Sequence, residues 1–271
     1  MIWNLIQYYI FPSALVAVVF LVVLRFALPR GVMTVFKREL KSFFQSPIAY
    51  VCVVIFLLVS GGLAFFFGNL IEFNEASLLV FFQWHPWIYM VIAPAIGMRL
   101  WSEEQRMGTV ELIMTMPIAP WQVILGKFLA AMVVIFVALA LTFPAVLTID
   151  YLGEPDHGAV FAGYVGSFLL GVSFLGVTSA VSAFSRSQVV TLLISVALCM
   201  FLNLAGFDPV TGFLRNVFGE SIAEGVASFG TMTHFTEFTK GIIVSRDLIF
   251  FLSVTVLSLF VTSAVLRAKR A

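Results

Sequence analysis

Long apolar segments separated by short polar ones dominate the pattern of this chain. Six of these segments are predicted to be transmembrane helices, because each approaches or exceeds the roughly 20 residues that cross the hydrocarbon core. A helix also satisfies its own backbone hydrogen bonds in the absence of water. The pattern therefore predicts an all-α polytopic membrane protein. The predicted spans are, approximately, residues 47–68, 81–101, 121–148, 160–184, 188–207 and 247–266.

A further apolar run, residues 8–28, precedes these spans and is closed by Arg25 and Arg30. A secretory signal carries its positive charge before the apolar run and a cleavage site after it, and neither feature is found here. Two interpretations stay open. Residues 1–32 form an extra transmembrane helix with its N-terminus outside, or translation begins at Met33. In both, residues 33–271 form a single membrane domain.

The segment 34–46 is amphipathic rather than apolar. Aromatic and aliphatic side chains recur at helical spacing, while basic side chains gather on the other side, which is typical of a helix lying in the lipid headgroup layer. Pro47 is expected to end this helix or to open the next one. The residues assigned to the interfacial helix are Phe36, Lys37, Arg38, Leu40, Lys41 and Phe44.

The composition and the placement of charge agree with this pattern. Hydrophobic residues make up 61% of the chain and charged residues 11%, against about 45 to 50% and 25% in globular proteins. The net charge of +1 provides no basic field for nucleic acid. With these spans, all Lys and Arg residues except Arg215, Lys240 and Arg246 fall on one side. The positive-inside rule makes that side, with the C-terminus, cytoplasmic.

The longest exterior segment, residues 208–246, is only mildly polar. Its periodicity predicts two short amphipathic helices with a Gly-rich join around Gly225 and Gly230, dipping part-way into the outer leaflet.

Motifs for catalysis are not found in the sequence. His85, His157 and His234 are distant from one another and form no His-Glu-x-x-His motif. Gly126-Lys127 lacks the other residues of a P-loop, so the chain is not expected to bind ATP. No metal or other cofactor is expected in this chain either. The predicted hydrocarbon centres also contain no ionisable residue, which argues against ion-driven transport.

Small residues recur every four positions in the fourth span, at Gly163, Ser167 and Gly171. This spacing allows close approach of helices. Packing within the chain is favoured over a dimer face.

The polar interruption at residues 102–117 is predicted to form two short helices. Ser102 and Gln105 match a capping box. Gly108 is expected to break the first helix, Thr109 to cap a second helix at 110–116, and Pro117 to close it. A short rigid element of this kind is suited to bind a soluble partner.

At these residues the sequence resembles the permease subunits of ABC type-2 exporters, in particular gliding-motility-type permeases. The likeness covers about residues 33–268 and includes Gly126-Lys127 and the preceding segment FKRELKSFFQSP. The residues of the interruption that carry it are Glu103, Glu104, Gly108, Thr109, Glu111, Leu112 and Pro117, and the resemblance assigns these, together with Ser102, to an ATPase-coupling loop.

The resemblance implies a six-helix permease core with an N-terminal interfacial helix and re-entrant exterior helices before the last span. It also implies export across a bacterial inner membrane by a homodimer or pseudo-dimer of permeases. Each would bind a separate ABC ATP-binding subunit, which carries ATP and magnesium, and an accessory periplasmic or membrane protein could join them. The alternatives are a channel or secondary carrier, and a membrane scaffold without transport.

Overall fold

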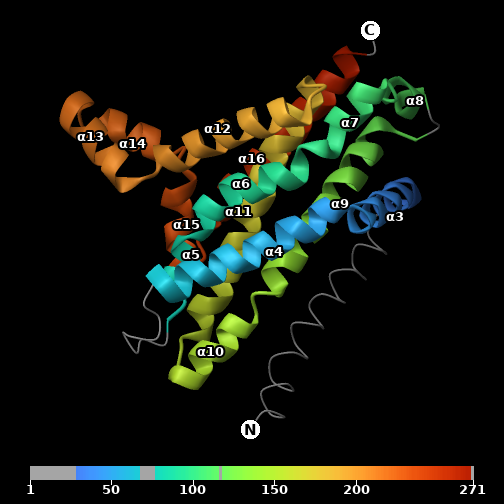
Figure 1. Ribbon diagram of the computed structural model, residues 1–271. Helices are drawn as coiled ribbons and strands as arrows, with labels where there is room; N and C mark the ends of the chain where they lie inside the picture. Colours follow the sequence, from blue (N-terminus) through green and yellow to red (C-terminus); the bar gives the residue numbers. More distant parts are fainter. Residues whose placement is uncertain (1–28, 68–76, 116–117, 270–271) are drawn as a thin grey trace.

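The computed structural model describes residues 29–67, 77–115 and 118–269, and every regular element within these residues is a helix (Figure 1). The apolar run at residues 8–28 and Pro117 of the polar interruption lie outside the described residues.

The described chain begins with two helices that meet at a sharp bend. The chain bends by 72° between helix α3, Arg30–Gln45, and helix α4, Pro47–Gly62. Ser46 caps α4, because its Oγ accepts a hydrogen bond from the amide of Ile48 at 3.4 Å, and Pro47 occupies the first turn, where no amide donor is needed. The predicted turn at Pro47 is therefore present. A π-helical turn, Leu63–Phe67, follows α4.

The second predicted span, residues 81–101, is not one uninterrupted helix. It is divided at Trp84 and Met98 into α5 (Leu79–Gln83), α6 (His85–Gly97) and α7 (Arg99–Met107). Pro86 has no amide donor for a helical hydrogen bond, which explains a break near Trp84. The prediction of a single helix ending near residue 101 was wrong.

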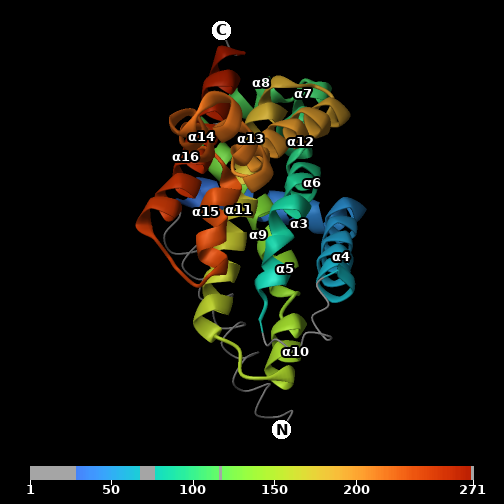
Figure 2. The same ribbon diagram turned by 90° about the vertical axis from the view of Figure 1, so that its left-hand side faces the viewer.

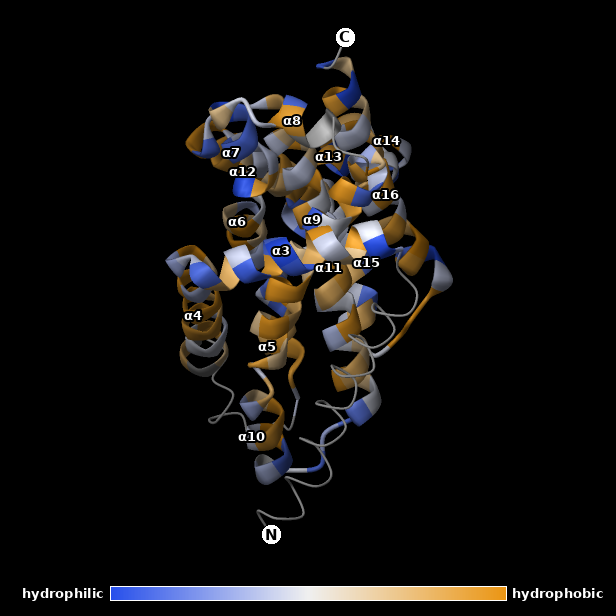
Figure 3. Cartoon of the chain, turned by 90° about the vertical axis from the view of Figure 1, so that its right-hand side faces the viewer, coloured by the Kyte–Doolittle hydropathy of each residue, from blue (hydrophilic) through white to orange (hydrophobic). Residues whose placement is uncertain are grey.

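The remaining long helices agree with the predicted spans to within a few residues. Helix α9 (Pro120–Ala140) continues through a turn into α10 (Pro144–Leu152), and α11 (His157–Phe184), α12 (Gln188–Ala205) and α16 (Ser245–Ala268) follow. By length and apolar composition, four of the described helices can cross a membrane, and the bent pair of α3 and α4 raises this to five. Apolar residues predominate on α4 to α6, whereas α7 carries polar ones (Figure 3).

Contacts define two opposite ends of this helix bundle. At one end, Gln105 of α7 lies beside Ala183 at the end of α11 and Lys269 at the end of α16. At the other end, His234 contacts Asp247 at the start of α16. We call these the α7 end and the α15 end.

Helix α11 lies between α6 and α16, and its small residues permit close contact with α5 and α6. A Cβ atom at Gly163 would overlap the ring of Phe82, and one at Gly171 would lie 3.0 Å from the Tyr89 ring. Between them, Ser167 Oγ lies 2.6 Å from His85 Nδ1. The predicted series Gly163, Ser167 and Gly171 thus lies against neighbouring helices of the same chain.

Residues 208–246, which the sequence predicts to be exterior, form three helices rather than the two predicted. They are α13 (Asp208–Phe218), α14 (Glu220–Ala227) and α15 (Thr231–Thr239). The join between the first two is Gly219, whose φ of 90° favours glycine, whereas Gly225 lies inside α14. Helices α13 and α14 form a hairpin that projects from the bundle at the left of Figure 1 and lies in front of it in the view of Figure 2.

Helix α15, in contrast, is anchored to the bundle by buried polar contacts. Thr231 Oγ1 donates to Asn203 Oδ1 at 2.6 Å, and the side-chain Nδ2 of Asn203 donates to the backbone carbonyl of Pro86 at 2.8 Å. His234 Nδ1 lies 2.7 Å from Asp247 Oδ1, and its Nε2 lies 3.0 Å from the carbonyl of Ser228. These contacts connect α15 to α6, α12 and α16.

Candidate functional site

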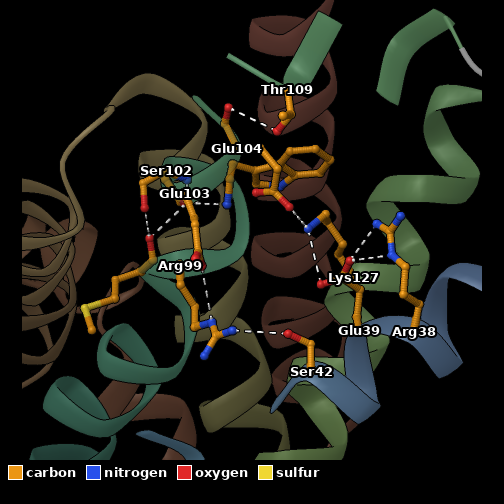
Figure 4. A network of polar contacts seen from close by, with 12 residues as sticks. Arg38, Glu39, Ser42, Arg99, Ser102, Glu103, Glu104, Thr109 and Lys127 are labelled. Carbon is orange, nitrogen blue, oxygen red and sulfur yellow. Dashed lines mark hydrogen bonds and ion pairs between the residues drawn. The ribbon is translucent and has the colours of Figure 1, made fainter. Parts of the chain in front are cut away.

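A buried lysine connects three helices at the α7 end (Figure 4). Lys127, on α9, is 1% exposed. Its ammonium binds a carboxylate oxygen of Glu104 on α7 and lies 3.3 Å from Glu39 Oε2 on α3. It also lies 5.3 Å from the centre of the Trp101 ring, a cation–π contact. The lysine therefore joins α3, α7 and α9 at one point.

The charges around Lys127 are arranged so that none is buried without a counterion. Glu39 also accepts a hydrogen bond from Arg38 at 2.8 Å. Burial alone would raise the pKa of Glu39, but the Lys127 ammonium and Arg38 outweigh it, so the net pKa lies below its ordinary value of 4.5. Glu39 therefore remains ionised when Lys127 is charged.

Close packing brings α3 and α9 together beside this cluster. A Cβ atom at Gly126 would lie 2.8 Å from the Cβ atom of Val35 on α3, so a glycine is needed for this approach. Gly126 allows α9 to approach α3 closely, and Lys127 next to it forms ion pairs with Glu39 and Glu104. These two roles explain why a glycine is followed by a lysine at this point of α9.

A second set of contacts joins the start of α7 to α3. The Arg99 guanidinium donates to Ser42 Oγ at 3.3 Å and lies 5.2 Å from the centre of the Phe43 ring. Its Nε lies 3.8 Å from Glu103, one turn further along α7. Glu103 thus pairs within its own helix, whereas Glu104 reaches α9.

The opposite face of α7 is bonded to α11 through Ser182. The Ser182 hydroxyl accepts hydrogen bonds from the amides of Trp101 at 2.9 Å and Ser102 at 3.1 Å, in the first turn of α7. Ser102 lies inside the helix, and its hydroxyl donates to the carbonyl of Met98. The prediction that Ser102 caps this helix was wrong, because a distant serine satisfies the free amides instead.

Gln105 completes the connection to α11 and α16. Its amide nitrogen donates to the carbonyls of Ser182 at 3.1 Å and Ala183 at 2.5 Å, and its oxygen accepts from Lys269 Nζ at 2.5 Å. Lys269 also donates to the carbonyl of Ala183 at 2.9 Å, one of the free carbonyls at the end of α11. Partial burial, and then the nearby Arg186, lower the pKa of Lys269.

Beyond these contacts, α7 ends at Gly108 as the sequence predicts. Gly108 has φ 69°, and the amide of Thr109 donates to the carbonyl of Glu104 at 2.9 Å, which is a Schellman motif. Helix α8, Val110–Thr115, follows. Leu112 is 61% exposed on it, and Glu111 is exposed beside it. The short helix is thus presented at the surface, directly after the helix that contacts both sides of the bundle.

Replacing Gly108 with valine is expected to destabilise the chain by about 1 to 2 kcal/mol, because a β-branched residue fits poorly in the left-handed region. Unfolding in mixed micelles measures this change. Gly108→Asn is the matched control, since asparagine tolerates that conformation and should behave nearly as wild type. Equal stability of the valine and asparagine variants would show that the left-handed turn is not needed.

The family comparison covers almost the whole described structure. Residues 33–270 match the model of the ABC-2 family transporter proteins. The chain belongs to this family. A search of curated proteins gave no significant match. The ABC-2 family protein is therefore a multi-pass membrane protein and a component of membrane transport, and members of this family normally work with an ATP-binding subunit. Residues 1–32 lie outside the matched region.

The structure of the ABC-2 family protein adds residues that the sequence did not single out. Glu39, Ser182 and Lys269 carry no local motif, and their partners are distant in sequence. Lys127 belongs to the Gly126-Lys127 pair that carries the resemblance, but its buried position between Glu39 and Glu104 was not predicted. Of the predicted coupling residues, Ser102, Glu103 and Glu104 contribute to this network, whereas Glu111 and Leu112 lie on the exposed helix that follows.

Proposed function

We propose that this chain is the permease subunit of an ATP-driven ABC exporter in a bacterial inner membrane. A separate ABC ATP-binding subunit, which holds ATP and magnesium, docks on the 102–117 loop. The observation that carries the proposal is the position of α7, which leads directly into the exposed helix α8 and is bonded to the bundle on two faces.

In this mechanism α7 moves as a rigid helix and transmits motion from α8 to the rest of the bundle. A displacement of α8 by the ATP-binding subunit moves α7, and Glu104 transmits the motion through Lys127 to α3 and α9. Gln105 transmits it to the ends of α11 and α16. Buried polar contacts suit this role because separating their partners is costly. The helices would therefore move together rather than slide past α7.

The proposed topology has six membrane crossings, formed by α4, α5 to α7, α9, α11, α12 and α16. The α7 end and the C-terminus are proposed to be cytoplasmic, because most described Lys and Arg residues lie in the segments assigned to that side. Arg215, Lys240 and Arg246 instead lie between the end of α12 and the first turn of α16. Helix α3 lies in the inner headgroup layer with Lys37, Arg38 and Lys41 exposed.

The transport unit is proposed to contain a second permease copy or a homologous permease. Apolar side chains remain exposed along α12 and α16, including Leu193, Ile194, Val256 and Phe260, and these faces suit lipid and another helix bundle. The proposed cargo is lipid-linked, glycan-like or amphipathic.

Leu112→Asp is expected to reduce recovery of the ATP-binding subunit about tenfold, because docking would then bury an unpaired charge. The measurement is purification of the tagged permease from its native membrane, with the ABC protein quantified by mass spectrometry. Tyr151→Asp, at an exposed site on α10, is the control and should retain the subunit. Full retention with Leu112→Asp would contradict docking on α8.

A further inference from the structure

A cavity of about 690 Å³ opens at the α15 end, between the start of α6, the turn from α12 to α13, and α15. This volume lies within the range of about 300 to 1,000 Å³ that is usual for small-molecule sites. The coupling residues at the α7 end do not line it. The cavity is therefore separate from the proposed site for the ATP-binding subunit.

Aromatic rings form one part of the lining. Trp84 and Trp87 lie three residues apart where α6 begins, and Phe207 contributes from the turn between α12 and α13. The rings of Trp87 and Phe207 meet edge to face, with their centres 5.5 Å apart. Aromatic faces carry partial negative charge and attract both apolar chains and organic cations.

Besides uncharged residues, the lining contains three charged ones, Asp208, Glu237 and Lys240, whose balance is negative. Lys240 lines the cavity, but its Nζ already lies 3.0 Å from Glu237 Oε1. Asp208 also lines the cavity and is exposed, and no ion pair of Asp208 is found among the described residues. The lining therefore combines aromatic rings with a carboxylate that has no ion-pair partner among the described residues and lies in the first turn of α13.

The wall formed by α15 is held in place before any ligand binds. Its N-terminal end is bonded to Asn203 through Thr231, and a Cβ atom at Gly230 would overlap the backbone of Gly206. His234 fixes its other face to Asp247. A preformed cavity loses less conformational entropy on binding than a mobile one.

We propose that this cavity binds the ammonium headgroup of an amphiphile. The cation lies against the aromatic rings and near Asp208, and the apolar chain extends toward the membrane. An anionic headgroup would be repelled by Asp208, whereas an ammonium group places the opposite charge beside it. The assignment does not depend on the ATP-binding partner, because the two sites lie at opposite ends of the bundle.

The test uses the full chain in a neutral maltoside detergent, titrated with hexyltrimethylammonium below its micelle concentration. Saturable heat in calorimetry and a saturable change in tryptophan fluorescence are expected. Hexyl sulfate and hexyl glucoside, which have the same chain, are expected to give neither response. Equal or tighter binding of either compound would overturn the assignment to an ammonium group.

Two variants test the residues. Asp208→Asn is expected to weaken binding about fivefold, as for a partly exposed charge pair, and Trp87→Leu about tenfold. Glu154→Gln removes the same charge at an exposed position outside the cavity and should leave binding unchanged. Because Asp208 is exposed, its variant should fold. Identical affinities of the Asp208 and Glu154 variants would overturn the proposal.

Discussion

Replacing Lys127 with methionine is expected to destabilise the chain by about 3 to 5 kcal/mol, the effect of removing one partner from a buried ion pair. Methionine has a similar volume, so the loss comes from charge rather than packing. Glu39 and Glu104, whose side chains are each 15% exposed, would be left close together without the cation. Equilibrium unfolding in mixed micelles measures the change.

The control for this variant is Lys41→Met on the exposed side of α3, which should change stability little. A double variant with Lys127→Met and Glu104→Gln should recover part of the loss, because one uncompensated charge is removed. If Lys127→Met and Lys41→Met were equally stable, the buried network would not hold α3, α7 and α9 together.

The same network predicts a direction for the effect of pH. The pKa of Glu39 in the folded chain lies below its ordinary value of 4.5. Its ionised form thus contributes stability that is present above pH 4.5 and is lost as the pH falls through the lowered pKa. In Lys127→Met, where the main cation is absent, this acid-dependent loss should be smaller.

Replacing His234 with alanine is expected to cost about 3 kcal/mol, because Asp247 would lose a buried partner. Asp247 is 0% exposed, and its other described ion-pair partner, Arg246, has a side chain that is 69% exposed. Unfolding in mixed micelles measures the loss. His157→Ala, at the exposed start of α11, is the control and should cost much less.

A double variant distinguishes the polar contact from lost packing of His234 on the Phe250 ring, which lies 4.0 Å away between centres. Adding Asp247→Ala to His234→Ala should restore part of the stability, since no unpaired carboxylate then remains. A further loss equal to the sum of the single effects would mean that the two residues act independently.

Local sequence patterns predicted those parts of the fold that depend on local chemistry. Pro47 predicted the turn between α3 and α4, and Gly108 predicted the end of α7, because each residue restricts or permits particular backbone angles. The length of the apolar segments predicted α9, α11, α12 and α16, because a segment that crosses the hydrocarbon core satisfies its backbone hydrogen bonds as a helix.

The contacts that surround α7 could not be predicted in this way. The first turn of α7 is capped by Ser182, and Gln105 meets Lys269, although each pair is far apart in sequence. Ser102 fits a capping pattern, but a distant hydroxyl satisfies the free amides of the helix better. Such long-range choices depend on which helices become neighbours, which the local pattern does not encode.

The most direct test of the account is photo-crosslinking from Leu112 in the native membrane. A photoreactive residue at Leu112 is expected to form an adduct that mass spectrometry identifies as an ABC ATP-binding protein. The same residue at Tyr151, exposed on α10, is expected to give no such adduct. An ABC protein captured from Tyr151 and not from Leu112 would contradict docking at α8 and the proposed orientation of the whole chain.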